Sequence, residues 1–71
     1  MIMDNDDIKE SLNALIRKRD ELVSELEDLQ DKHKSGLVAE EEYQSKRRAI
    51  EREIVEVMDR IVQLQFISGQ R

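Results

Sequence analysis

The sequence predicts an all-α protein: an antiparallel, coiled-coil-like two-helix hairpin that pairs with a second copy to form a four-helix bundle. The 71-residue chain is 41% charged, has no Pro, Cys or Trp, and carries only two Gly. This composition is typical of long helices and coiled coils. Apolar residues recur in both halves at alternating steps of three and four, and a Gly stands near the midpoint. We expect one domain over residues 1–71.

The first helix is expected over residues 5–34. Its regularly spaced apolar residues are Ile8, Leu12, Leu15, Leu22, Leu26 and Leu29. Arg19 occupies the position in this series between Leu15 and Leu22. The spacing gives about three to four heptads with a narrow apolar seam along one side of the helix.

A turn is expected over residues 35–39. Gly36 is the residue type that most often ends a helix in a left-handed conformation. Basic residues 32–34 precede it and the acidic residues 40–42 follow it, as the dipoles of two separate helices require. The alternative is one helix of about sixty residues through Gly36, since an interior Gly costs only ~1 kcal/mol relative to Ala.

The second helix is expected over residues 40–68. Its seam consists of Tyr43, Arg47, Ile50, Ile54, Val57, Ile61 and Leu64. Ala39 stands near the N-cap, where the lack of a polar side chain costs about 1 kcal/mol, and Glu42 is placed to supply a capping carboxylate. If the arms pair about Gly36, the numbers of facing residues add to roughly 72.

Apolar residues between positions 54 and 67 outnumber the seam positions that one neighbouring helix can cover. Val55, Met58 and Val62 form a second stripe, and Ile16 and Val23 widen the face of the first helix. A face wider than a seam implies more than one helical neighbour, most simply in a two-fold dimer. The predicted interaction residues are Ile16, Ile54, Val55, Met58, Ile61, Val62 and Phe66.

Arg19 and Arg47 are expected to be polar seam residues that fix helix register. A polar residue at a seam position specifies register and oligomeric state at some cost in stability. Their aliphatic stems would lie across the seam while the guanidinium groups reach water or acids such as Glu25 and Glu53. A carboxylate from a partner is the alternative.

No catalytic or metal-binding pattern is present, so we expect no enzymatic activity and no cofactor. His33 is the only histidine, and Gln30 stands where the Glu of a Glu-x-x-His motif would be. No Ser has a neighbouring His that could act as a base. We interpret His33 as a surface residue near a helix C-terminus.

The net charge of −5 argues against nucleic acid as a partner, although residues 17–19 and 46–52 contain basic clusters. No apolar run approaches the ~20 residues of a membrane span, so we expect no membrane partner. Residues 1–7 lack the features of a signal peptide, and a cytoplasmic location is expected.

Residues 29–47 resemble the SHOCT-type (short C-terminal domain) helical hairpin. The match consists of Gly36, Leu37, Val38, the acids Glu40 to Glu42, Tyr43, Lys46 and Arg47. Ala39 departs from the Ser or Thr often found before the acids. The resemblance implies an oligomerisation module without an active site, in which Leu37, Val38 and Tyr43 close the turn end.

The expected function is therefore that of a non-enzymatic interaction or oligomerisation module that self-associates through an apolar face on the second helix. One alternative is a small regulatory protein that masks a larger protein by laying a helix into an apolar groove. Another is a helical protein associated with nucleic acid through the basic clusters.

Overall fold

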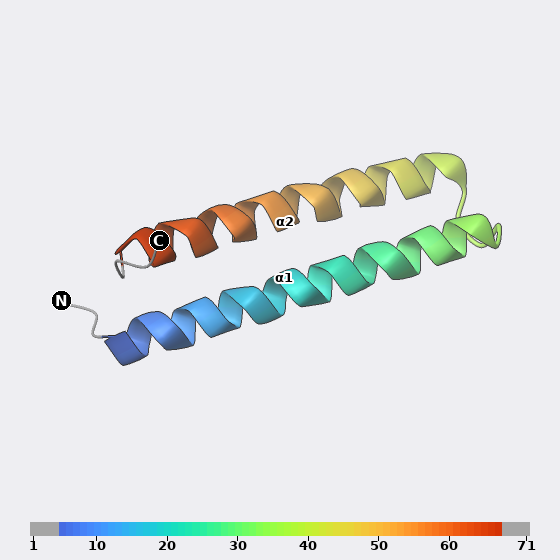
Figure 1. The fold of residues 1–71 in the computed structure, drawn as a ribbon. Helices are drawn as coiled ribbons and strands as arrows, with labels where there is room; N and C mark the ends of the chain where they lie inside the picture. Colours follow the sequence, from blue (N-terminus) through green and yellow to red (C-terminus); the bar gives the residue numbers. More distant parts are fainter. Residues whose placement is uncertain (1–4, 68–71) are drawn as a thin grey trace.

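The protein is a hairpin of two antiparallel helices, shown in Figure 1. The computed structural model describes residues 5–67, in which α1 spans Asn5–Lys34 and α2 spans Glu40–Ile67. These bounds match the expected helices, except that residue 68 lies outside the described residues. The two helices pack against each other, which confirms the hairpin and excludes one continuous helix. We call the end where α1 begins and α2 ends the open end, and the other the turn end.

The turn is held by the backbone pattern that commonly ends a helix at Gly. Gly36 has a φ of 78°, and its N–H donates to the carbonyl of His33 at 3.1 Å. The N–H of Leu37 donates to the carbonyl of Lys32 at 2.9 Å. These two bonds form a Schellman motif, which satisfies carbonyl groups that the helix itself leaves unpaired. Gly36 therefore has the role that the sequence predicted.

Gly36→Ala is expected to lower the free energy of unfolding by about 1–2 kcal/mol, the cost of a left-handed conformation in a residue with a Cβ. A Cβ at this position would meet no atom within 4 Å, so the loss comes from the backbone alone. Urea unfolding of both chains measures it. Gly36→Asn should lose less, because Asn tolerates this conformation better. Equal stability of the parent and the Ala variant would show that the turn does not constrain the fold.

The start of α2 lacks the expected capping box. Ala39 is the N-cap residue, and its carbonyl accepts from the N–H of Tyr43 at 2.8 Å. The carboxylate of Glu42, expected to cap the helix, instead lies 3.0 Å from Nζ of Lys46, one turn further along α2. A side chain one turn away offers a charged partner, whereas the backbone N–H offers a neutral one. The three Glu residues of the first turn still face the positive end of the helix dipole.

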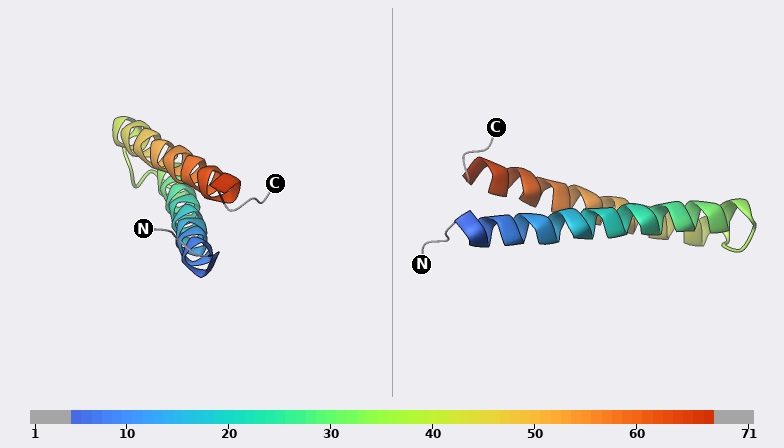
Figure 2. Two further views of the ribbon diagram at one scale, coloured as in Figure 1. Left: turned by 90° about the vertical axis from the view of Figure 1, so that its left-hand side faces the viewer. Right: turned by 60° about the horizontal axis from the view of Figure 1, so that its bottom comes forward.

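The core follows the predicted seam. Leu22, Val57 and Ile61 form its centre, and Leu22 is the most completely buried, at 2% exposed. The partly buried residues packed against this centre are Leu12, Leu15, Ile16, Ile50 and Ile54. Figure 2 shows that the helices cross at an angle. The cluster lies in the contact between α1 and α2.

The register differs from the expected one by about one helical turn. The rings of His33 and Tyr43 stack across the hairpin, and these numbers add to 76 rather than 72. The sum of 72 takes Gly36 as the centre of the turn, whereas α1 ends at Lys34 and α2 begins at Glu40, so the centre lies beyond Gly36. Leu22 and Ile50, expected to face each other, nevertheless belong to the same cluster.

Candidate interaction surface

An exposed apolar stripe runs along α2 outside the seam. Its members are Val55, Met58, Val62 and Phe66, which are 58%, 48%, 62% and 84% exposed. At 3.6 residues per turn they fall within an arc of about 80°, centred roughly 120° around the helix from the seam. We call these four residues the outer stripe.

Two residues of α1 extend the outer stripe across the hairpin. Ile16 and Val23 each follow a seam residue by one position, as Met58 follows Val57 on α2. When two helices run antiparallel, the residues that directly follow a seam residue lie on the same side of the seam in both helices. Val23 is 38% exposed and Ile16 is partly buried. Together with the outer stripe they form what we call the apolar face.

The structure divides the predicted interaction residues into two groups. Ile61 is buried in the core of the hairpin, and Ile54 packs against it. Both fall on the same side of α2 as Val57, whereas Val55 and Val62 each lie one residue further around the helix. Ile61 is therefore already covered by α1 in the single hairpin, and a part for it in an interaction surface stays a prediction.

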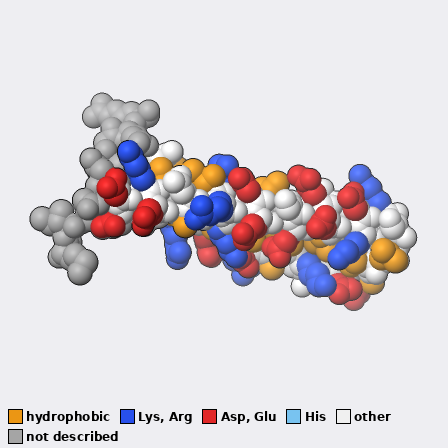
Figure 3. Space-filling view, turned by 90° about the horizontal axis from the view of Figure 1, so that it is seen from below, with side chains coloured by type: hydrophobic (Ala, Val, Ile, Leu, Met, Phe, Trp, Pro, Cys, Tyr) orange, Lys and Arg blue, Asp and Glu red, His pale blue; other side chains and the backbone are white. Residues whose placement is uncertain are grey.

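Charged side chains are spread along one face of the rod. In the view of Figure 3, acidic and basic side chains follow one another along the rod, and apolar atoms show between them. Arg19 lies 3.1 Å from Asp20, and Lys46 pairs with Glu42. Pairs of this kind mark a solvated helix surface and add little to stability.

The turn end carries a network of polar side chains that the sequence did not predict. Gln44 Nε2 donates to Glu40 Oε1 at 2.9 Å, and Arg47 Nη2 donates to Gln44 Oε1 at 2.8 Å. Arg47 Nη1 lies 3.4 Å from a carboxylate oxygen of Glu51. We call Glu40, Gln44, Arg47 and Glu51 the polar ladder. It continues along the turn half of α2 toward the side on which Met58 lies.

His33 connects the polar ladder to α1. Its Nε2 lies 2.5 Å from Glu40 Oε2, and its ring stacks on Tyr43 with centroids 3.9 Å apart. Arg47 lies over the same Tyr43 ring, 5.9 Å from the centroid. His33 lies in the last turn of α1, as the sequence predicted, and its ring also contacts residues beyond the turn. The pairing depends on the register across the turn, which the heptad spacing alone does not determine.

Tyr43 and its neighbours close the turn end only in part. Tyr43 and Val38 are partly buried, but Leu37 is 76% exposed. Leu37 was expected to help close this end. Its backbone N–H is held by the Schellman bond to Lys32, which fixes the chain there while its side chain remains in solvent.

Arg19 and Arg47 lie at the seam with their guanidinium groups turned to acids on their own helices. Arg19 pairs with Asp20, and Arg47 pairs with Glu51, so the expected partners Glu25 and Glu53 are not the ones used. Asp20 directly follows Arg19, and Glu51 lies one turn along α2 from Arg47, so neither pair depends on how the two arms are aligned. The Nε atom of Arg47 is buried without a partner among the described residues. A role for these residues in setting register stays a prediction.

The pKa of the Glu40 carboxyl is lowered, first by the hydrogen bond from Gln44 and then by that to His33. A lowered pKa in the folded state means that the ionised group stabilises the fold above the ordinary carboxyl pKa. That contribution disappears as the pH falls through the folded pKa. Gln44→Ala should raise the pKa of Glu40 toward its ordinary value, as an NMR titration of the side-chain carboxyl would measure. Ser45→Ala is the control, and an equal titration curve in all three chains would contradict the hydrogen-bonded arrangement.

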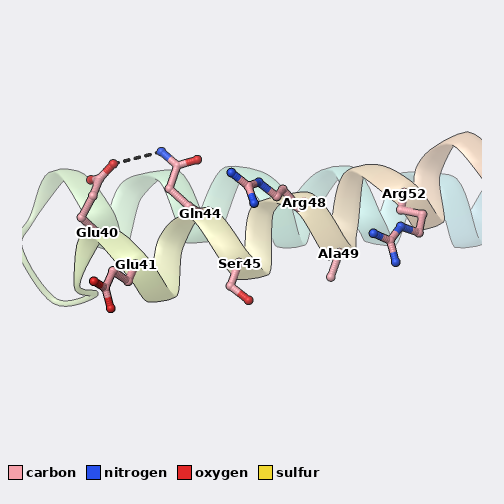
Figure 4. Close-up of a pocket in the computed structure, with 7 residues that line it drawn as sticks. All are labelled: Glu40, Glu41, Gln44, Ser45, Arg48, Ala49 and Arg52. Atoms are coloured by element: carbon pink, nitrogen blue, oxygen red, sulfur yellow. Dashed lines mark hydrogen bonds between the residues drawn. The ribbon is translucent and has the colours of Figure 1, made fainter.

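The surface grooves formed by residues 5–67 are open to solvent rather than enclosed. One groove follows the outer side of α2 and is drawn in Figure 4, where the side chains of Arg48 and Arg52 extend from the same helix as Glu40 and Gln44. Its residues are Glu40, Glu41, Gln44, Ser45, Arg48, Ala49 and Arg52. Since all seven come from one helix, no second element closes over a ligand.

A second groove lies between the helices near the open end. It is lined mainly by apolar atoms, and its residues are Ser11, Ala14, Leu15, Arg60, Gln63, Leu64 and Ile67. Within residues 5–67, no three His, Asp or Glu side chains are placed to hold a metal ion. Neither described helix combines the length and apolar character needed to cross a membrane.

Comparisons with protein families, with curated proteins and with solved structures find no match for this chain. The similarity of residues 29–47 to a SHOCT-type hairpin therefore stays a prediction from the sequence. In structural terms, the described residues form an all-helical, two-helix hairpin with an exposed apolar face.

Proposed function

We propose that this chain is a non-enzymatic self-association module whose apolar face packs against the same face of a second copy. The observation that carries the proposal is the outer stripe, in which three of four apolar side chains are more than half exposed. A contiguous exposed apolar surface is typical of an interaction site. A closed two-fold dimer would cover this surface on both copies at once.

The small core supports the same proposal. Only five apolar side chains among the described residues are buried: Ile8, Leu22, Leu29, Val57 and Ile61. A core of this size rarely supplies more than ~3–5 kcal/mol without a disulfide, a metal or a partner chain. Each Val, Met or Phe side chain moved from water into an interface contributes about 1.5–3 kcal/mol, against the entropic cost of association.

Sedimentation at low and high salt tests the proposal. Two chains that each carry a net charge of −5 repel one another, so added salt should strengthen the dimer. We expect a mass of two chains at micromolar concentration and a lower dissociation constant at higher salt. A monomer under all conditions would contradict the proposal. Measured under the same conditions, binding to nucleic acid that weakens with added salt would support the alternative based on the basic clusters.

A second candidate is that α2 docks into the groove of a larger protein and masks it. The outer stripe favours this candidate through its spacing, since steps of three, four and four residues match the anchors of a helix that lies in a groove. Hydrogen exchange separates the two. If the amides from Val55 to Phe66 exchange more slowly as the concentration is raised, the second copy covers this face. If their exchange does not depend on concentration, the face is free for another protein.

A further inference from the structure

We infer that two copies overlap only through their open-end halves, antiparallel and staggered, with their turns at opposite ends of a longer rod. This inference rests on the proposed self-association and specifies how the second copy is placed. It follows from the distribution of apolar and polar side chains along one side of the hairpin.

The first argument is that the outer stripe occupies only one half of α2. On α2 the outer stripe begins at Val55 and continues to Phe66, in the half nearest the open end. The turn half of the same helix carries the polar ladder, from Glu40 to Glu51. An interface over the full length would withdraw the ladder's carboxylates and guanidinium group from water, which is costly for charged groups. An interface over the open-end half leaves them hydrated.

The second argument is the internal symmetry of the outer stripe. Its members lie nearly evenly about residue 60: Val55 and Phe66 are equally far from this centre to within one residue, as are Met58 and Val62. A two-fold axis across the rod at this level places Val55 against Phe66 of the second copy and Met58 against Val62. The stripe is therefore complementary to its own antiparallel copy, as a two-fold interface requires.

Other overlaps bring unlike surfaces together. If two antiparallel copies overlapped along the whole rod, Phe66 of one copy would lie against the polar turn half of the other. Phe66 is 84% exposed in the single chain. A full overlap with both turns at one end would include both polar ladders in the interface. The staggered arrangement avoids both, and its turn ends project away from the contact.

The particle length distinguishes these arrangements. One hairpin is 49 Å long, so a fully overlapped dimer keeps about that length. From a rise of 1.5 Å per residue, overlap around residue 60 alone gives a rod of about 75 Å. Small-angle X-ray scattering of the unmodified dimer should show the longer rod. A dimer of about 50 Å would overturn the inference and leave the proposed self-association standing, while a monomer would remove both.

A cysteine at the turn gives an independent measurement, because the chain has no native Cys. Ser35→Cys is expected to form no disulfide within the dimer when oxidised, since the two turns lie far apart. Asp59→Cys, close to the inferred axis, should cross-link readily. Efficient cross-linking through position 35 within a dimer, with none at position 59, would contradict the staggered arrangement.

Replacing two members of the polar ladder tests the cause of the stagger. Gln44→Leu combined with Glu51→Leu extends the apolar face toward the turn, and the dimer is expected to shorten toward 49 Å. Glu53→Leu, on the opposite side of the seam, serves as the control and should leave the length unchanged. If the double variant keeps the longer rod, Gln44 and Glu51 do not determine the overlap.

Discussion

Leu22→Ala is expected to leave the hairpin largely unfolded. Leu22 is 2% exposed and stands in the centre of the cluster with Val57 and Ile61. Truncating a buried Leu to Ala costs about 2–5 kcal/mol, because the lost transfer energy and the cavity add. A core of this size supplies about the same amount, so little net stability would remain. Far-ultraviolet circular dichroism should show loss of most helical signal at 25 °C, or a midpoint of thermal unfolding well below that of the parent.

Leu37→Ala is the matched control, since it removes the same atoms from a side chain that is 76% exposed. An exposed position of this kind changes the free energy of unfolding by about 0.5 kcal/mol or less. If both variants melt at the temperature of the parent, the hairpin core described here does not hold the fold together. If Leu22→Ala and Leu37→Ala both unfold, the side chain of Leu37 is buried by a contact outside the single hairpin.

Val62→Asp is expected to dissociate the dimer without unfolding the hairpin. Val62 is 62% exposed in the single chain and lies near the centre of the outer stripe. In the isolated hairpin an Asp at this position would be solvated, but in the interface its carboxylate would be buried without a partner. An unpaired buried charge costs about 3–5 kcal/mol, so the dissociation constant should rise at least a hundredfold. Sedimentation equilibrium measures the constant, and circular dichroism checks that the helix content is retained.

Gln63→Asp introduces the same charge one residue away. Gln63 lines the groove on the other side of the seam, outside the apolar face. Its substitution should raise the dissociation constant only slightly, through the added negative charge. Equal weakening by both variants would mean that net charge, and not the outer stripe, controls association.

The fold was predictable because its signals are local. The seam of each helix follows from spacing within that helix, and the turn follows from Gly36 between charges of opposite sign. The left-handed φ of Gly36 and the buried position of Leu22 both agree with that prediction. Neither depends on how the arms are aligned.

The candidate surface was predictable only in part because it depends on how the helices are aligned and turned. The sequence showed that residues 54–67 carry too many apolar groups for one seam, but it did not separate Ile61, which α1 covers, from Val62, which it does not. The stacking of His33 on Tyr43 and the bond to Glu40 required a register that differs by a turn from the expected one. Contacts between residues of different helices need that alignment, which heptad spacing leaves open.

The mass of the folded particle tests the central claim most directly. Multi-angle light scattering on the unmodified chain, coupled to size separation at micromolar concentration, gives this mass without a label or a substitution. Self-association through the apolar face predicts a folded, helical particle of twice the 8.4 kDa chain mass. A folded, helical particle of 8.4 kDa that persists as the concentration and the salt are raised would contradict it.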